Sequence, residues 1–388
     1  MLKRNFLMTG SALVLAVPAT LMLASAAWSD EVDPPRAIDA LEWQFRDDTT
    51  ILVYGQINKG ILTFDDGGRS TTYGLTDNDN SSTRAGVKST TDFDSGWQLF
   101  SNIEIDYQPH ASNVVSQLDK NASDYSFTNA NIRKIEVAMF SEKYGRFWLG
   151  QGSMASDDTA KAEKSGTRVI TYSDISDMAG GSLFRLANGD LSDVSINDSF
   201  SNYDGLGRKV RIRYDTPDFN GFRLKTSYGQ DLLTSDNPKD LYDVAATYDG
   251  EFNDIAIAGA MGYGRDTGAD ADIFSASASG LHTPTGLSLT LAGGQRSADI
   301  TGSYGYVKLG WETDFFDWGN SAFSVDYYDG SKINNSSSSS KAYSIAGVQD
   351  IDYWDTELWL AFRNHEYDDD LGDYQDGLAV FGGARIKF

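Results

Sequence analysis

About sixteen segments of this chain, each about 8–13 residues long, alternate apolar and polar side chains, as does a β-strand with two unlike faces. Between residues 222 and 228, for example, Phe, Leu, Thr and Tyr alternate with Arg, Lys and Ser. The alternation predicts an all-β fold but does not say which face is outside, because a soluble sandwich alternates too. The segments begin near Thr50, Thr83, Trp97, Ile132, Arg146, Lys209, Phe222, Leu241, Ile255, Asp272, Leu287, Ser303, Ala322, Ala342, Thr356 and Gly377.

The connections between these segments alternate in length. Short turns, such as 92–96 and 141–145, alternate with connections that are mostly longer and more polar, such as 65–81 and 108–131. Short turns at one end and long loops at the other are typical of outer-membrane barrels, whose tilted strands need about 9–11 residues. We therefore expect a 16-stranded antiparallel transmembrane β-barrel in the cell outer membrane. The longest connection, 153–207, has about 55 residues, and so long a loop indicates a functional role.

The N-terminal residues have the features of a secretory signal peptide. Lys3 and Arg4 precede a mostly apolar stretch over 6–23, and small residues follow. We expect cleavage after Ala26; cleavage after Ser29 and an uncleaved anchor helix are the alternatives. No later apolar run approaches the roughly 20 residues of a membrane helix. The expected organisation is a signal peptide over 1–26, a periplasmic lead-in over 27–48 with a brief helix at 38–45, and a barrel over 49–388.

The charge balance excludes one class of function. The chain has 56 acidic and 32 basic residues, a formal net charge of −24, and loss of the signal peptide removes two of the bases. Binding of nucleic acid is not expected, because neutralising phosphates needs a basic surface. The absence of cysteine fits an envelope protein without disulfides.

Aromatic residues bracket nearly every short turn, for example Phe93 with Trp97 and Tyr144 with Phe147. Because amphipathic rings settle at the headgroup level of a membrane, such a row predicts an interfacial girdle. The alternative is a set of turn-flanking core aromatics. The last strand ends at Phe388, like the C-terminal strand of outer-membrane barrels that their assembly machinery reads.

Four motifs carry a resemblance to a known family: VYGQ at 53–56, TRAGVK at 83–88, GRFWLGQ at 145–151 and RIKF at 385–388. In this order and spacing the chain resembles a general diffusion porin of Gram-negative bacteria, of the alphaproteobacterial type, over essentially the whole mature chain. The resemblance implies a homotrimer in contact with outer-membrane lipid and lipopolysaccharide. It also implies that the third outer loop, here 153–207, folds into the lumen and narrows it as a constriction loop. That loop lacks the short motif of the enterobacterial branch, so none of its residues takes a role from there.

Charged residues in the expected lumen suggest how such a pore would select. Acids on the loop and bases on the wall would set up a transverse field, which disfavours apolar solutes, and the net charge predicts a preference for cations. The alternative is that the bases merely line a wet lumen or neutralise Glu104 and Asp106. The candidate acids are Asp157, Asp158, Glu163, Asp174 and Asp177, with Asp190, Asp193 and Asp198 further along. The candidate bases are Arg84, which matches a family wall arginine, and Lys88, Lys209, Arg211, Arg213, Arg223 and Lys225.

The expected function is passive diffusion of small hydrophilic solutes and ions, and three rivals remain. An enzyme is not expected, because His110, His282 and His365 are the only histidines and no serine has a nucleophile setting. A substrate-specific channel, for instance for sugars, needs inward aromatics, for which Trp148, Trp359, Phe100 and Phe140 are candidates. A soluble adhesin is the third rival. No cofactor is expected, although Asp157–Asp158 and Asp368–Asp370 offer oxygens suited to Ca²⁺.

Overall fold

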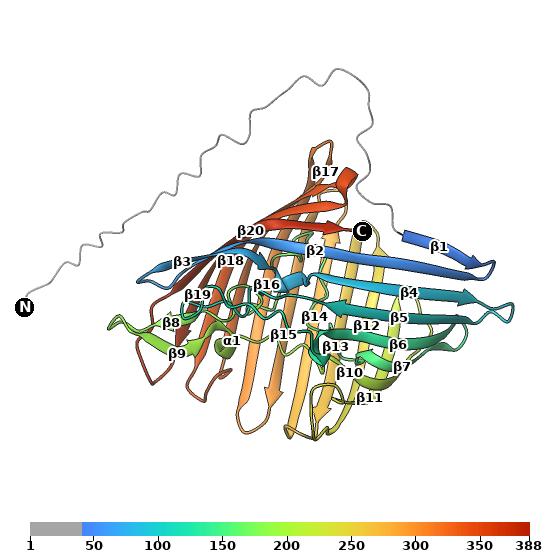
Figure 1. Cartoon of the computed structure of the whole chain (residues 1–388), viewed down its shortest axis with the longest axis horizontal. Helices are drawn as coiled ribbons and strands as arrows, with labels where there is room; N and C mark the ends of the chain where they lie inside the picture. The colour runs from blue at the N-terminus through green and yellow to red at the C-terminus, as the bar shows by residue number, and fades with distance from the viewer. Residues whose placement is uncertain (1–40) are drawn as a thin grey trace, which may run out of the picture. The chain divides into compact units, whose positions relative to one another are not determined.

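A computed structural model describes residues 41–388, all of which belong to one compact unit. The expected signal peptide and the lead-in up to residue 40 lie outside the described residues. Within 41–388, sixteen antiparallel strands close into a barrel, which confirms the predicted fold class (Figure 1). In the same range, no helix has the length and apolarity needed to cross a membrane. The barrel strands are β2 (Thr49–Asp65), β4 (Arg84–Asp92), β5 (Gln98–Asp106), β6 (Ile132–Ser141), β7 (Gly145–Ser153), β10 (Arg208–Asp215), β11 (Phe222–Gln230), β12 (Asp240–Phe252), β13 (Ile255–Asp266), β14 (Ala271–His282), β15 (Leu287–Ser297), β16 (Thr301–Phe316), β17 (Gly319–Ser331), β18 (Ser339–Ile351), β19 (Thr356–Asp368) and β20 (Gly377–Lys387).

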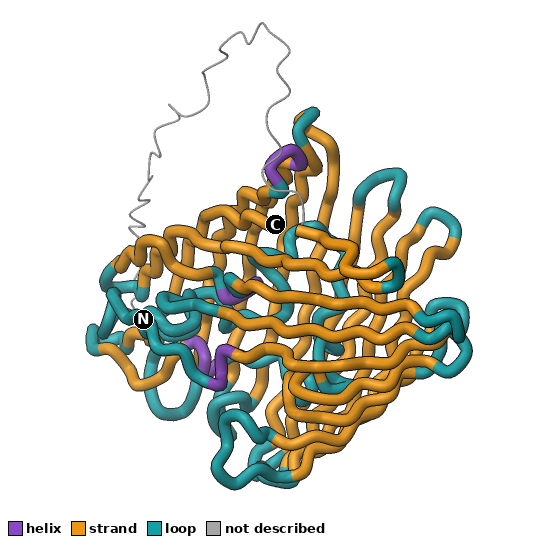
Figure 2. The backbone as a smooth tube through the Cα atoms, turned by 45° about the vertical axis from the view of Figure 1, so that its right-hand side comes forward, coloured by secondary structure: helices purple, strands orange, loops and turns teal. Residues whose placement is uncertain are grey.

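The barrel closes between its first and last strands. β20 pairs antiparallel with the second half of β2, from Gln56 opposite Lys387 to Asp65 opposite Leu378. The terminal residue continues this pairing, because Phe388 N–H donates to Gly55 O at 3.1 Å and Gly55 N–H donates to Phe388 O at 2.8 Å. Short turns gather at one end of the strands and longer connections at the other (Figure 2).

Two further strands extend the sheet beside β2, and neither was expected. β1 (Leu41–Arg46) pairs with the first residues of β2. The helix expected at 38–45 overlaps β1, so the prediction of a helix was wrong. Its apolar residues, Leu41, Trp43 and Phe45, recur with period two, which suits a strand beside an open sheet edge better than a helix. β3 (Ser70–Asp77) lies within the connection expected over 65–81 and pairs with the second half of β2.

The two faces of the barrel differ in polarity and exposure. Along β17 and β18, exposed residues such as Val325 and Ile345 alternate with buried residues such as Asp326 and Ser344. Because the sheet is closed, the buried polar row faces inward and the apolar row faces the membrane. Aromatic contacts such as Phe147 with Tyr214, whose ring centroids are 4.8 Å apart, lie on the outer face near the short turns.

Candidate pore and constriction

The segment 154–207, between β7 and β10, makes its hydrogen bonds to the inward row of the wall. On β14, Ser275 Oγ lies 2.6 Å from Thr159 Oγ1, and Ser277 Oγ donates to the Thr159 carbonyl at 2.8 Å. Ser277 Oγ also accepts from the Ala162 N–H at 2.8 Å. Small hydroxyl side chains with alternate spacing therefore let the backbone of the segment approach the wall closely.

A buried ion pair fixes the first part of this segment to β16 of the wall. Lys308 of β16 is 1% exposed, and its ammonium group pairs with the Glu163 carboxylate and donates to the Thr171 carbonyl at 2.7 Å. A buried ammonium group is stable only when it is paired and hydrogen-bonded, and both partners here come from the segment. Lys308 is thus an anchor for the segment, which sequence reasoning missed.

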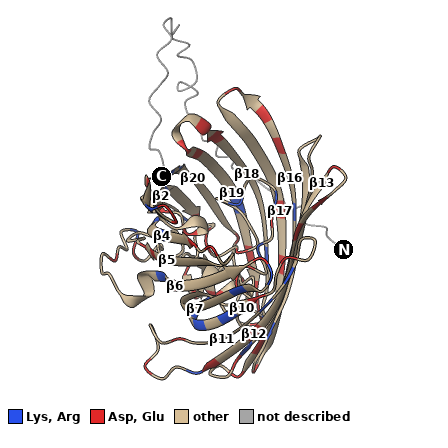
Figure 3. Ribbon diagram, turned by 90° about the vertical axis from the view of Figure 1, so that its right-hand side faces the viewer, with Lys and Arg blue, Asp and Glu red and all other residues tan. Residues whose placement is uncertain are grey.

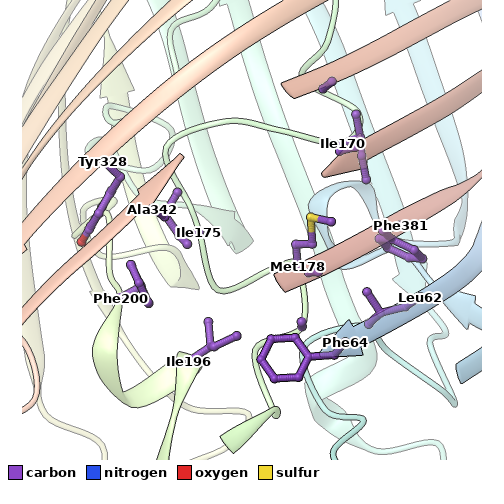
Figure 4. Packing of buried hydrophobic residues seen from close by; sticks show 14 of the residues in the cluster. Leu62, Phe64, Ile170, Ile175, Met178, Ile196, Phe200, Tyr328, Ala342 and Phe381 are labelled. Carbon is purple, nitrogen blue, oxygen red and sulfur yellow. The ribbon is translucent and has the colours of Figure 1, made fainter. Parts of the chain in front are cut away.

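An apolar cluster supports the rest of the segment (Figure 4). Ile170, Ile175 and Met178 of the segment are fully buried in a cluster that also holds Phe64 of β2 and Phe381 of β20. Burying a side chain of this size contributes about 1.5–3 kcal/mol, which offsets the ordering of so long a connection. The segment also forms a small hairpin, β8 (Leu183–Arg185) with β9 (Leu191–Ser195), and one helical turn, α1 (Ile196–Ser199).

The hairpin is tied to the connection between β2 and β3. Arg185 donates from Nε and Nη2 to the two oxygens of Asp66, at 2.8 Å and 2.9 Å. Burial alone would raise the pKa of Asp66, but Arg185 and the backbone N–H groups of Gly68 and Arg69 outweigh it and lower the pKa to about 2. The carboxylate is therefore charged at every ordinary pH and the bidentate pair persists.

A polar cavity of about 550 Å³ lies between the segment and one side of the wall. The wall and the neighbouring connections contribute both charges, and the segment faces them with three acids, two bases and a tyrosine. The charged lining residues are Asp79, Glu104, Asp106, Arg84, Arg133, Lys134, Arg208 and Arg385 on the wall side, and Asp158, Lys161, Arg168, Asp174 and Asp177 on the segment.

The wall side of this cavity carries uncompensated positive charge. Arg133 is neutralised, because it donates to Glu104 at 2.6 Å and to Asp106 at 3.3 Å. In contrast, the side chains of Arg84, Lys134 and Arg208 form no hydrogen bond or ion pair with any residue of 41–388. Three free cations therefore face the cavity from the wall.

The segment side combines free and neutralised acids. The side chain of Asp158 is 62% exposed and lies 3.4 Å from Arg168 and 3.9 Å from Lys161. Burial would lower the pKa of Lys161, but the acids around it, first Asp204 at 2.8 Å, outweigh burial and raise it. Asp174 accepts a hydrogen bond from Ser176 and pairs with no base of the described chain.

The charge of Asp177 differs from that of the exposed acids. Asp177 is buried beside Tyr172, whose hydroxyl donates to its carboxylate. Burial, followed by the neighbouring Asp174 and Asp79, raises its pKa well above the usual range. The negative charge that faces the wall is therefore carried mainly by Asp158 and Asp174.

Arg84, Asp158, Asp174 and Asp177 are the sequence-predicted residues that meet in this cavity. The other candidates lie elsewhere on the inner face. Arg211 pairs with the Glu136 carboxylate and donates to Ser153 O at 3.0 Å, and Arg213 pairs with Asp215 at 2.7 Å and donates to Met154 O at 3.1 Å. Both arginines therefore hold the start of the segment against β10.

The remaining candidates have other partners on the wall or the segment. Lys88 lies over the Tyr54 ring at 4.1 Å, Arg223 pairs with Asp218 at 3.2 Å, Lys209 pairs with Asp231 at 3.0 Å, and Glu163 is in the buried pair with Lys308.

Sequence reasoning did not single out Arg133, Lys134, Arg208, Lys161 or Arg385. Arg133 and Lys134 begin β6 and Arg208 begins β10, at boundaries where a turn of the chain decides which way a side chain points. The sequence feature that could have indicated Arg133, Lys134 and Arg208 is the position of basic residues at the loop ends of predicted strands.

The acidic groups considered for calcium have different surroundings. Carboxylate oxygens of Asp157, Asp158 and Asp204 lie within 4.8 Å of one another, and the Lys161 ammonium group lies 2.8 Å from Asp204. Asp369 accepts hydrogen bonds from Tyr367 at 2.7 Å and Asn335 at 2.9 Å.

A closed sixteen-stranded barrel with a membrane-facing apolar surface and a charged inner passage defines an outer-membrane channel. The family model of the Gram-negative porins matches residues 11–370, and the chain belongs to this family. It is an outer-membrane β-barrel, as the sequence predicted.

Solved structures of bacterial porins share the fold at low sequence identity. An anion-selective porin from Comamonas acidovorans is 17% identical, with 88% of this chain and 100% of that chain covered and a TM-score of 0.58. OmpT of Vibrio cholerae is 13% identical, with 90% and 100% covered and a TM-score of 0.56. Salmonella typhi OmpF in complex with daunomycin is 14% identical, with 90% and 100% covered and a TM-score of 0.56. No curated protein sequence matches the chain.

Proposed function

We propose that this porin is a passive, water-filled pore for small hydrophilic solutes and ions, narrowed by the constriction loop 153–207. The cavity between that segment and the wall is the observation that carries the proposal. Its lining supports the proposal, because it includes the bases Arg84, Lys134 and Arg208 of the wall and the acids Asp158 and Asp174 of the segment. A field across such a passage orders water, so an apolar solute loses more than it gains by entering.

We propose further that the pore prefers cations and that the preference arises at its mouths. Six acids and seven bases line the cavity, so the narrow part is nearly balanced. The acid excess of the chain lies in the connections at the strand ends (Figure 3). Exposed examples are Asp236, Asp254, Asp270, Asp299, Asp317 and Asp370. Negative mouths raise the local concentration of cations, and this favours their entry.

The assembly that we propose is a homotrimer in outer-membrane lipid and lipopolysaccharide. One of the structures with this fold, OmpT of Vibrio cholerae, is described as a trimer form. The C-terminal Phe388 closes the barrel on β2, which supports its proposed recognition by the assembly machinery. Residues 1–26 remain the proposed signal peptide and 27–48 the proposed periplasmic lead-in.

Liposome swelling tests the diffusion part of this proposal. Vesicles that contain the purified protein should swell in neutral sugars at rates that fall smoothly with solute size and rise linearly with concentration. A rate that saturates for one sugar alone would favour the substrate-specific alternative. Reversal potentials across a KCl gradient test the ion preference, and a clear anion preference would overturn it.

A further inference from the structure

Three aromatic side chains stand together on the inner face, near the short turns. Phe100 of β5 and Phe140 of β6 point inward, since each shares its face with buried polar residues of its own strand, and Trp148 of β7 contacts both rings and donates to the buried Asp215. The ring centroids are 5.7 Å apart for Phe100 and Phe140, 5.9 Å for Phe100 and Trp148, and 5.2 Å for Phe140 and Trp148. We call these three residues the aromatic triad.

The triad differs from Trp359, the fourth aromatic candidate for the inner face, which is packed within the wall. Trp359 is 3% exposed, and its indole N–H donates to Asn58 at 3.0 Å, so it belongs to the wall. The triad rings are instead partly exposed towards the lumen, where apolar surface in contact with water is unfavourable. The Trp148 indole N–H donates to Asp215 at 3.1 Å, and the guanidinium groups of Arg211 and Arg213 lie 5.6 Å and 5.8 Å from the centroid of its ring, so the ring is held in place. Partly exposed and immobilised rings in a wet passage offer an apolar contact surface.

Beside the triad, the Asp215 carboxylate is paired with Arg213 at 2.7 Å, whereas two nearby bases have no acidic partner in the described part of the chain. The Arg146 guanidinium lies 5.0 Å from the centroid of the Phe140 ring, and no hydrogen bond or ion pair joins it to residues 41–388. Lys225, two strands further along the same cross-strand row, likewise has no such partner among these residues. A cavity of about 980 Å³ at this end of the barrel is lined by Phe140, Arg146 and Arg223, among others.

We propose that the aromatic triad and Arg146 form a binding subsite for small planar carboxylates. The ring of the solute would pack against the exposed part of Phe140, and its carboxylate would accept a pair of hydrogen bonds from the fork of Arg146. The unpaired guanidinium group of Arg146 favours a carboxylate over a neutral sugar as the ligand, because a sugar has no negative charge to pair with it.

This inference rests on the proposed function, because the subsite lies within the pore. Single-channel recording in a planar bilayer tests it with benzoate as the probe. Benzoate on the short-turn side should reduce the ion current in a saturable way, whereas acetate, which lacks the ring, and benzamide, which lacks the charge, should not. The Arg146→Gln variant should weaken the block about tenfold and Phe140→Leu about threefold to tenfold.

Lys341→Gln is the matched control, because Lys341 is an exposed lysine of β18 and is not among the residues that line the cavity beside the triad. Its benzoate block should equal that of the unaltered protein. Normal conductance without saturable benzoate block, or a block equal in all variants, would overturn the subsite while the pore stands. Absence of conductance from folded protein would instead overturn the proposed function.

Discussion

The buried pair between Lys308 and Glu163 gives the strongest single perturbation of the segment 154–207. The side chains are 0% and 2% exposed, and Lys308 also donates to Thr171 O at 2.7 Å. Removing one partner leaves the other charge buried and uncompensated, which costs about 3–5 kcal/mol. Because about 1.4 kcal/mol corresponds to a factor of ten, the ratio of docked to undocked segment should fall by about a hundredfold or more. The apolar cluster around Ile170 and Met178 should keep the rest of the segment in place.

Single-channel current measures this release directly. The Lys308→Met variant should conduct more and show added open-channel noise, because the part of the segment near Glu163 moves away from β16. The double variant with Glu163→Gln should recover most of the quiet behaviour, since neither charge is then left unpaired. Lys341→Met, which changes an exposed lysine of β18, is the matched control. A Lys308→Met pore as quiet as the unaltered one, or a double variant as noisy as the single, would refute the anchor.

Three further results follow from the charges. The cation preference should be strong in dilute KCl and fall towards none near 1 M, where screening reaches only about 3 Å, and a preference that persists at 1 M would place its origin in the constriction. Arg84→Gln should raise the cation preference by roughly twofold in reversal-potential measurements, since a unit charge at about 8 Å in water contributes about 0.5 kcal/mol. An unchanged ratio of cation to anion permeability would mean that Arg84 does not face the ion path. The ion pair between Asp66 and Arg185 should weaken in acid, because the pKa of Asp66 is lowered to about 2. The stabilisation that this pair gives the fold, on the order of 2 kcal/mol, is complete above about pH 4 and is lost as the pH falls to about 2. Pepsin cleavage in 183–195 should therefore rise over this range in the unaltered protein and stay constant in Asp66→Asn.

The wall of the barrel was largely readable from the sequence. The expected strand starts near Thr50, Thr83 and Phe222 differ by at most one residue from Thr49, Arg84 and Phe222 in the structure. A local pattern of period two determines such strands, and the short turns between them fix their order. β1 and β3 were not predicted, because they pair only with the exposed edges of β2. The pattern of alternating residues does not show that these edges are free.

The arrangement around the constriction was less accessible, because it depends on contacts between distant residues. Which wall residue meets Glu163 depends on the path of a segment of about 55 residues, and that path is set by the packing of side chains such as Ile170 and Phe381. The inner-face arginines of β10 illustrate the limit. The alternation placed Arg211 and Arg213 on the correct face, but only the structure shows that backbone carbonyls and nearby acids engage them.

The most direct test of the account is the insertion of the purified, refolded protein into a planar lipid bilayer under voltage. The account predicts stepwise increases in current in groups of three equal steps, one for each pore of a trimer. Folded protein that inserts without any conductance would contradict the central claim that this barrel encloses an open aqueous passage.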